Sequence, residues 1–297
     1  MSVHRILALT DLSENSLAGL DLAERLSHRL HARIVVGYVH TRTDILESFS
    51  RGREDALRLA QWVREDDEEH LRAVCEKHIE PLRLQGVETV EMPNARTGVQ
   101  ELIERSKPDL VCMATRGRSG VAHLLLGSIA EHTLRTAGVP VIVTKGVAIP
   151  PPGEPLRVLV ALDLIEDPSG FARNVATLLG EGDEIVLGHV VESWYYSPAA
   201  YGSEFALPQP DVPELAEAAR SRLAEIDVRV EGVSTSVEVG MGRPGEGLLE
   251  LEERVKPNIV AARTHGRRGL DRMMLGSVSE FLARRCEGAV LIFPSGR

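Results

Sequence analysis

The chain has 297 residues, which is enough for one large domain or for two domains of ordinary size. Its 44 Asp and Glu residues outnumber its 34 Lys and Arg residues, and the formal net charge of −10 argues against a general attraction to nucleic acid or to an anionic membrane. The three cysteines are widely spaced among apolar residues, which favours buried thiols over a disulfide or zinc framework. Because we find no signal-peptide core and no apolar run of about 18 residues, we expect a soluble, cytoplasmic protein.

Strands and helices alternate along the first half of the chain. Apolar runs predict strands at residues 5–10, 32–40, 87–93, 109–115 and 139–145. Apolar residues on one helical face, with charged residues between them, predict helices through residues 22–30, 53–85, 99–107 and 128–137. Strands that are apolar on both faces and are joined by helices indicate a parallel sheet that is covered on both sides.

The second half repeats this order of elements. Strands are predicted at residues 157–163, 184–191, 234–240, 258–264 and 289–294, and helices through residues 175–178, 214–226 and 245–255. An insertion at residues 192–213 holds most of the few aromatic residues and is either a lid or partner surface or a variable loop.

The join between the halves contains three successive prolines, which favour extended geometry and cannot extend a helix or a central strand. We therefore expect a first domain at residues 1–147, a proline-rich linker at residues 148–155 and a second domain at residues 156–297.

The halves also share a glycine-containing segment. "KPDLVCMATRG" in the first half matches "KPNIVAARTHG" in the second. Each half then carries two glycines ten residues apart with a serine directly after the second glycine: Gly117, Gly127 and Ser128 in the first half, and Gly266, Gly276 and Ser277 in the second. A repeat of this length indicates gene duplication followed by drift in the lengths of loops.

The glycine segment follows the fourth predicted strand, and Asp11 follows the first. Ligands of open parallel sheets bind beyond the carboxyl ends of the strands, where the strand order reverses, so these residues are expected to share one crevice. Gly127 and Ser128 begin a helix, where unpaired N–H groups and the helix dipole favour a phosphate, and Gly117 allows the backbone to approach closely. The Ser128 hydroxyl can donate to a phosphate oxygen, and Asp11 can accept from a base or a ribose. Together these residues favour a nucleotide.

A structural interpretation of the same residues is also open. Ser128 is a common type of helix N-cap, and Glu131, three residues later, would complete a capping box. Asp11 and Asp163 would likewise cap the helices that follow them. The pairing of an aspartate with a glycine segment in each half favours ligand binding.

On these residues, both halves resemble the universal stress protein domain over nearly the whole chain. That family carries an Asp after the first strand and, in its ATP-binding members, a Gly-x2-Gly-x9-Gly-Ser/Thr segment after the fourth, which "TRGRSGVAHLLLGSIAEHTL" resembles. The resemblance implies an α/β fold of two tandem doubly wound domains, each with a five-stranded parallel sheet of strand order 3-2-1-4-5. It further implies that the final strands of the two domains pair antiparallel, so that the tandem is an intramolecular dimer.

The resemblance also implies a nucleotide site in each half. In the first, Asp11 and the backbone of Val39 would contact adenine, Ala114 and Gly117 would lie near the ribose and phosphates, and the phosphates would be held by Gly127 and Ser128. The matching positions of the second half are Asp163, Val190, Arg263, Gly266, Gly276 and Ser277.

The two halves depart unequally from the pattern of the family. The family's first glycine is Ala114 in the first half, which adds one methyl group, and Arg263 in the second. A guanidinium there would occupy the ribose space or fold over the phosphates as a counter-charge. We expect a competent first site and a weakened second site.

Other charged residues lie in the same segments. Four arginines flank the glycines and either neutralise phosphate charge or are simply exposed: Arg116, Arg118, Arg267 and Arg268. His123 and His265 lack a partner at metal-ligand spacing, so no protein metal site is expected. Mg²⁺ would be held with a nucleotide, mainly by phosphates and water.

The sequence contains no Walker segment, no nucleophile elbow and no His-Glu-x-x-His motif, and so nominates no catalytic residue. We expect an ATP-binding stress protein, non-catalytic or at most slowly hydrolysing, whose nucleotide state alters binding to protein partners or to a second copy. The alternative is a nucleotide-free interaction module with the same fold, which Arg263 favours for the second half. A third hypothesis, an adenylyl-transferring enzyme, lacks a visible catalytic group.

Overall fold

The computed structural model describes residues 2–41, 53–115, 126–146, 149–151, 153–165, 168–192, 212–264 and 275–294. It divides into two compact units, the first comprising residues 3–146 and the second mainly residues 147–297. The predicted bounds of the two domains and the linker at residues 148–155 stay predictions.

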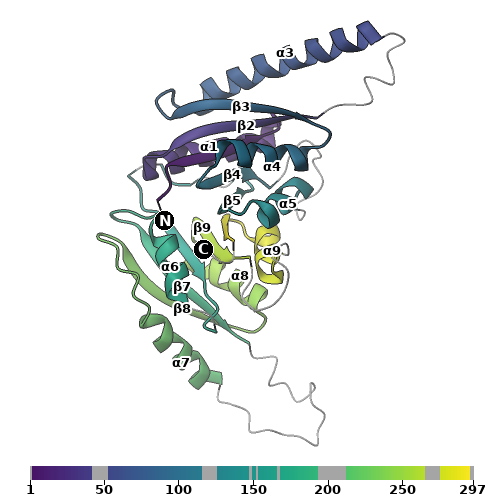
Figure 1. Ribbon diagram of the computed structural model, residues 1–297. Helices are drawn as coiled ribbons and strands as arrows, with labels where there is room; N and C mark the ends of the chain where they lie inside the picture. The colour runs from purple at the N-terminus through teal and green to yellow at the C-terminus, as the bar shows by residue number, and fades with distance from the viewer. Residues whose placement is uncertain are drawn as a thin grey trace, which may run out of the picture. The chain divides into compact units, whose positions relative to one another are not determined.

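In the first unit, strands and helices alternate along the chain (Figure 1): β1 (Arg5–Thr10), α1 (Glu14–Leu30), β2 (Arg33–Thr41), α3 (Arg53–His78), β3 (Leu84–Met92), α4 (Ala95–Ser106), β4 (Leu110–Ala114), α5 (Ser128–Thr136) and β5 (Val141–Thr144). The strands lie in the order β3-β2-β1-β4-β5, and the neighbouring strands pair parallel. The predicted parallel sheet of order 3-2-1-4-5 is therefore confirmed for this unit.

The second unit repeats this architecture (Figure 1): β6 (Arg157–Ala161), α6 (Pro168–Ala176), β7 (Glu184–Val191), α7 (Val212–Ala224), β8 (Ser234–Met241), α8 (Pro244–Val255), β9 (Ile259–Arg263), α9 (Ser277–Arg285) and β10 (Ala289–Phe293). Its strands lie in the order β8-β7-β6-β9-β10, and they also pair parallel. The order is that of the first unit, which confirms two tandem doubly wound domains.

The core of each unit follows from strands that are apolar on both faces. Every residue of β4 is buried, as is every residue of β10. In the first unit α1 packs beside α3, and α4 packs beside α5. Right-handed crossovers place these two pairs of helices on opposite faces of the sheet, so neither face of the central strands is open to solvent.

Two helix ends differ from the predictions. The helix predicted through residue 85 ends at His78, because Pro81 has no N–H group with which to continue it, and β3 begins at Leu84. The helix predicted through Leu178 ends at Ala176, and Leu178 lies in the following turn, where it is buried. Most of the predicted insertion, residues 193–211, lies outside the described residues.

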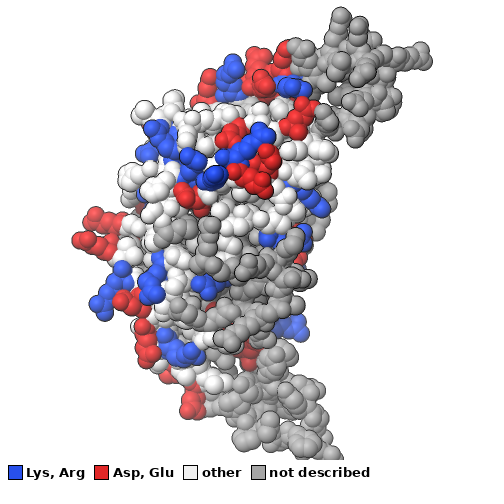
Figure 2. All heavy atoms as spheres, viewed as in Figure 1, with Lys and Arg blue, Asp and Glu red and all other residues white. Residues whose placement is uncertain are grey.

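The surface carries charges of both signs. On the face shown in Figure 2, Lys and Arg side chains lie beside Asp and Glu side chains, and several of the basic side chains are neighbours. Within the described part of the chain, every helix is too short or too polar to span a bilayer.

Candidate functional site

The carboxyl ends of β1 and β4 lie side by side in the first unit. The two strands pair in parallel, with Ala8 opposite Cys112, and the strand order reverses between them. Asp11 directly follows β1, and Ala114 is the last residue of β4. The fold therefore brings these two predicted site residues to one edge of the sheet, at the topological switch point.

Backbone hydrogen bonds fix the start of α5 beside the end of β4. The N–H group of Thr115 donates to the carbonyl oxygen of Thr144 at 2.8 Å, and that of Gly127 donates to the carbonyl oxygen of Thr115 at 2.8 Å. In the second unit Thr264 takes the same two roles, accepting from Gly276 and donating to Phe293. The first turn of α5, and likewise of α9, is thus anchored at the carboxyl edge of its sheet.

The residues between these anchors, 116–125 and 265–274, lie outside the described part of the chain. They include several residues that the sequence singled out: Gly117 and Gly266, the four flanking arginines, His123 and His265.

The start of α5 has no side-chain cap among the described residues. Gly127 is the N-cap, with φ −61° and ψ 145°, and Ser128 is the first helical residue and is exposed. The predicted capping box of Ser128 and Glu131 is therefore wrong, because the serine lies one position too far into the helix. Asn94, by contrast, caps α4 with its side chain. No described side chain caps the first N–H groups of α5, and such groups are a favoured site for an anion or water.

Asp11 supports the cap of α1 without being the cap itself. Its Oδ1 accepts from the N–H group of Ser13 at 3.1 Å and from the Ser13 hydroxyl at 2.5 Å. The Ser13 side chain in turn accepts from the N–H group of Ser16 at 3.4 Å. The Thr10 hydroxyl adds contacts to Ser16 and to the N–H group of Leu12, which has a left-handed φ of 64°. A chain of hydrogen bonds therefore positions the Asp11 carboxylate.

Among the described residues, Asp163 of the second unit has fewer polar contacts than Asp11 has in the first. Its Oδ1 accepts from the N–H group of Ile165 at 3.0 Å. Ile165 stands where the first unit has Ser13, and Leu162 stands where it has Thr10, so neither side chain can contribute a hydrogen bond. The alternative that Asp163 caps α6 has no support among the described residues, since its hydrogen bond with Ile165 forms a turn instead.

Val39 and Val190 occupy matching places in the two units. The pairing of β1 with β2 ends at Tyr38, so Val39 lies beyond the last paired residue, at the edge that also holds Asp11. Its side chain packs on Gly98 of α4, where a Cβ atom would collide with it. Val190 packs in the same way on Gly247 of α8. Each valine side chain is thus turned to a helix, and its main chain stays at the strand end.

The positions that replace the family's first glycine differ between the units. Ala114 is buried beneath α1, against Gly19. Arg263 is partly exposed, and its Cζ atom lies 5.1 Å from the centroid of the Phe171 ring, which comes from α6. Sequence reasoning identified Arg263 but missed Phe171, Gly19 and the side chain of Ser13. Aligning the helices of the two halves would have revealed the exchange of Gly19 for Phe171.

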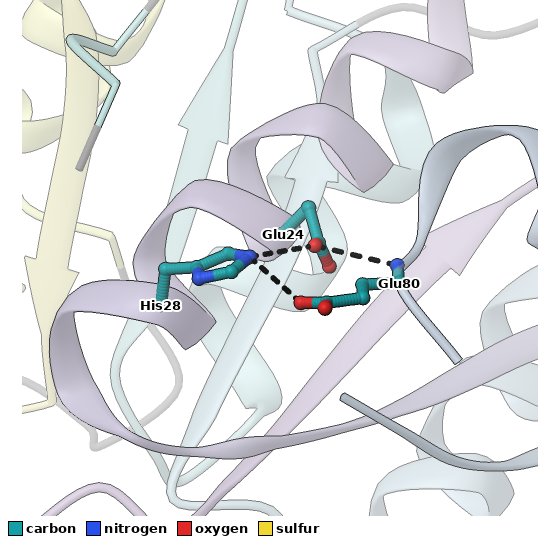
Figure 3. A group of neighbouring side chains, drawn as sticks. All are labelled: Glu24, His28 and Glu80. Carbon is teal, nitrogen blue, oxygen red and sulfur yellow. Dashed lines mark hydrogen bonds and ion pairs between the residues drawn. The ribbon is translucent and has the colours of Figure 1, made fainter. Parts of the chain in front are cut away.

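A cluster of Glu24, His28 and Glu80 has the residue types of a metal site (Figure 3). His28 Nε2 lies 3.1 Å from Glu24 Oε1 and 3.2 Å from Glu80 Oε2. Arg83 Nη2 lies 3.3 Å from Nδ1, and a guanidinium only donates, so Nδ1 accepts and the ring proton is on Nε2. That proton occupies the lone pair that a metal ion would need. The cluster therefore ties α1 to the turn before β3 by hydrogen bonds.

The structure defines a tandem of doubly wound α/β domains, each with an anchored helix start at the carboxyl edge of its sheet. The model of the universal stress protein family matches residues 2–145 and 156–294. The chain therefore belongs to the universal stress protein family, which confirms the resemblance seen in its sequence.

Individual proteins show the same relationship. A universal stress protein of Methanocaldococcus jannaschii is 27% identical over 147 residues, which cover 48% of this chain and 81% of that protein. One from Mycobacterium tuberculosis is 29% identical over 204 residues, 66% of this chain and 65% of that protein, slightly less than two thirds of its length. The crystal structure of a universal stress protein from Archaeoglobus fulgidus covers all of both chains with a TM-score of 0.61 and 22% identity, which shows the shared fold.

Proposed function

We propose that this protein binds an adenine nucleotide, ATP in the first instance, at the carboxyl edge of its first sheet and acts in a stress response by changing its binding to protein partners with nucleotide state. The observation that carries the proposal is the start of α5, which is anchored beside β4, lacks a side-chain cap among the described residues and lies at the edge that holds Asp11. A phosphate group is the ligand that such a helix start favours.

Each residue of the proposed site has a role that follows from its place. The N–H group of Ser128 would bind a phosphate oxygen, with the Ser128 hydroxyl as a further donor. Gly127, whose own N–H group donates to the carbonyl oxygen of Thr115, would let the phosphate approach the helix start closely. The Asp11 carboxylate, held by Ser13, would accept hydrogen bonds from the base or the ribose. The main chain of Val39 would contact adenine, and Ala114, at the end of β4, would lie near the ribose.

Magnesium, where present, would be bound by the phosphates and by water, with no ligand required from the protein. No described side chain is arranged as a nucleophile with its base, so the proposal assigns the chain no catalytic residue. The protein would contribute to binding, and to any slow hydrolysis by water, by positioning the nucleotide at the start of α5.

Isothermal titration of the purified chain with ATP, with and without Mg²⁺, tests this function. We expect saturable binding that Asp11→Ala weakens by at least about tenfold, which corresponds to roughly 1.4 kcal/mol, the loss of one hydrogen bond to a charged group. Asp227→Ala removes an exposed aspartate of the second unit that pairs with Arg229, and it should leave the affinity unchanged. The proposal fails if the folded chain gives no binding heat at millimolar ATP.

A nucleotide-free interaction module is the second candidate, and the Arg263–Phe171 contact favours it for the second unit. Gly127→Leu separates the two candidates, because a bulky side chain at the helix start should abolish a thermal shift caused by ATP. A module that works without nucleotide would keep both its stability and its partners in this variant.

A further inference from the structure

Three matching positions carry small residues in the first unit and large residues in the second. They lie on the first helix of each unit and at the last residues of its two final strands. Ala114 and Thr144 are neighbours in the register of β4 and β5, as Arg263 and Phe293 are in β9 and β10. The first unit has small residues at all three positions and the second unit has large ones: Gly19, Ala114 and Thr144 against Phe171, Arg263 and Phe293.

In the first unit, α1 lies directly on the end of β4. A Cβ atom on Gly19 would be 2.8 Å from the backbone nitrogen of Ala114 and 2.9 Å from Cα of Met113. Real Cβ atoms do not approach a backbone so closely, so the contact requires glycine. The carboxyl end of β4 is therefore covered on this face by helix backbone and carries no side chain larger than a methyl group at Ala114.

In the second unit, aromatic rings stand in the corresponding place. Phe171 of α6 and Phe293 of β10 are 2% and 4% exposed, and their ring centroids lie 5.4 Å apart at an interplanar angle of 72°. This is the edge-to-face geometry that aromatic pairs prefer. The guanidinium carbon of Arg263 lies 5.1 Å from the Phe171 centroid, within the range of a cation–π interaction. The three side chains form a cluster, called here the Phe171–Arg263–Phe293 cluster, at the carboxyl ends of β9 and β10.

The turn that carries the aspartate differs as well. Asp11 accepts hydrogen bonds from both the N–H group and the hydroxyl of Ser13, whereas the described hydrogen bond to Asp163 comes from the N–H group of Ile165. The Ile165 side chain is 78% exposed and offers no hydrogen bond. The hydroxyl that positions the aspartate is thus present in one unit and replaced in the other.

We infer that a chain binds one adenine nucleotide, in the first unit, and that the Phe171–Arg263–Phe293 cluster excludes the nucleotide from the second. This inference rests on the proposed function. A nucleotide between Asp163 and Gly276 must pass the end of β9, where the Arg263 side chain begins. Moving that side chain aside would break its contact with Phe171 and leave the aromatic face uncovered. The second unit thereby keeps the fold and loses the ligand.

Titration with ATP, analysed for the number bound per chain, tests this inference. We expect one nucleotide per chain, lost in Asp11→Ala and unchanged in Asp163→Ala. Two nucleotides per chain, one of which disappears in Asp163→Ala, would overturn the inference while supporting the proposed function. No binding in any variant would overturn the proposed function itself. These outcomes require no change to the cluster, so they do not depend on whether a cluster variant folds.

A gain of function tests the role of the cluster. Phe171→Ala with Arg263→Ala clears the end of β9, and Ile165→Ser restores the hydroxyl beside Asp163. We expect the triple variant to bind a second ATP that Asp163→Ala removes. Arg285→Ala is the matched control, because this substitution removes another arginine of the second unit that lies over an aromatic ring, 5.9 Å from the centroid of Phe281. The Arg285→Ala variant should still bind one ATP per chain. A folded triple variant that also binds only one ATP per chain would show that the cluster does not exclude the nucleotide.

Discussion

Replacing Ser13 by alanine tests how the site aspartate is positioned. The variant loses the N-cap of α1, whose hydrogen bond to Ser16 is long at 3.4 Å, at a cost of about 0.5–1 kcal/mol. It also loses the 2.5 Å hydrogen bond from the Ser13 hydroxyl to Asp11. This bond is worth about 1.5 kcal/mol, the lower end of the range for hydrogen bonds to charged groups. The lower end applies because both residues are partly exposed and water can replace the hydroxyl. The expected loss in the free energy of unfolding is about 2 kcal/mol.

Asn94→Ala is the matched control. Asn94 caps α4 in the same unit through a 3.0 Å hydrogen bond from the N–H group of Thr97, and its loss should cost about 1 kcal/mol. Urea unfolding of both variants, followed by circular dichroism, measures the difference. Ser13→Ala should lose about 1 kcal/mol more than Asn94→Ala, because the contact with Asp11, worth about 1.5 kcal/mol, outweighs the difference between the weaker cap of Ser13 and the cap of Asn94.

Nucleotide affinity separates positioning from stability. Ser13→Ala should bind ATP about fivefold more weakly, or roughly 1 kcal/mol, because Asp11 keeps the backbone hydrogen bond and loses the hydroxyl. Asn94→Ala should bind ATP as the parent does. The reasoning is refuted if the two variants lose equal stability and both keep the parent's affinity.

The remaining predictions concern titration, thiol reactivity and metal binding. Burial, and then the positive charges of Arg135 and Arg96, lower the pKa of His132 below 6.5. Below that pH the unfolded chain binds a proton that the native chain does not, so the melting temperature should fall as the pH drops through 6.5, and it should fall less steeply in His132→Asn. Burial and the charge of the neighbouring glutamate raise the pKa of Cys75 to about 11, and Cys112 is also buried, so mass spectrometry should find both thiols resistant to iodoacetamide until the chain is unfolded. Zn²⁺ should give no thermal shift that His28→Gln abolishes; such a shift would show that the ion displaces the Nε2 proton and binds the cluster.

Most of the fold could be predicted because its signals are local. Apolar runs bounded by charged helices locate the strands, and the repeat supports each assignment twice. Boundaries were less certain where one residue decides the outcome. Pro81 ends α3 earlier than its charged pattern indicates. The helix α5 begins at Ser128 as predicted, but its N-cap is Gly127, so Ser128 is the first helical residue and not the cap.

The parts of the site that the sequence did not predict depend on contacts between distant residues. Asp11 and the glycine segment were singled out because each follows a strand end. Nothing local in "LSENS" indicates that Ser13 positions the aspartate, since a serine there is an ordinary cap. The contact of Arg263 with Phe171 joins β9 to α6 across most of a domain, so only the packed structure shows where the guanidinium lies.

The helix contact at Gly19 has a consequence for how the two units diverged. A phenylalanine introduced there alone would meet the backbone of β4, and an arginine introduced alone at Ala114 would stand under a helix with no ring to cover it. Phe171 and Arg263 are in contact, so their contributions to the stability of the second unit should be coupled and not additive. The close packing of α1 on β4 in the first unit therefore restricts that unit to small residues at positions where the second unit has become free to vary.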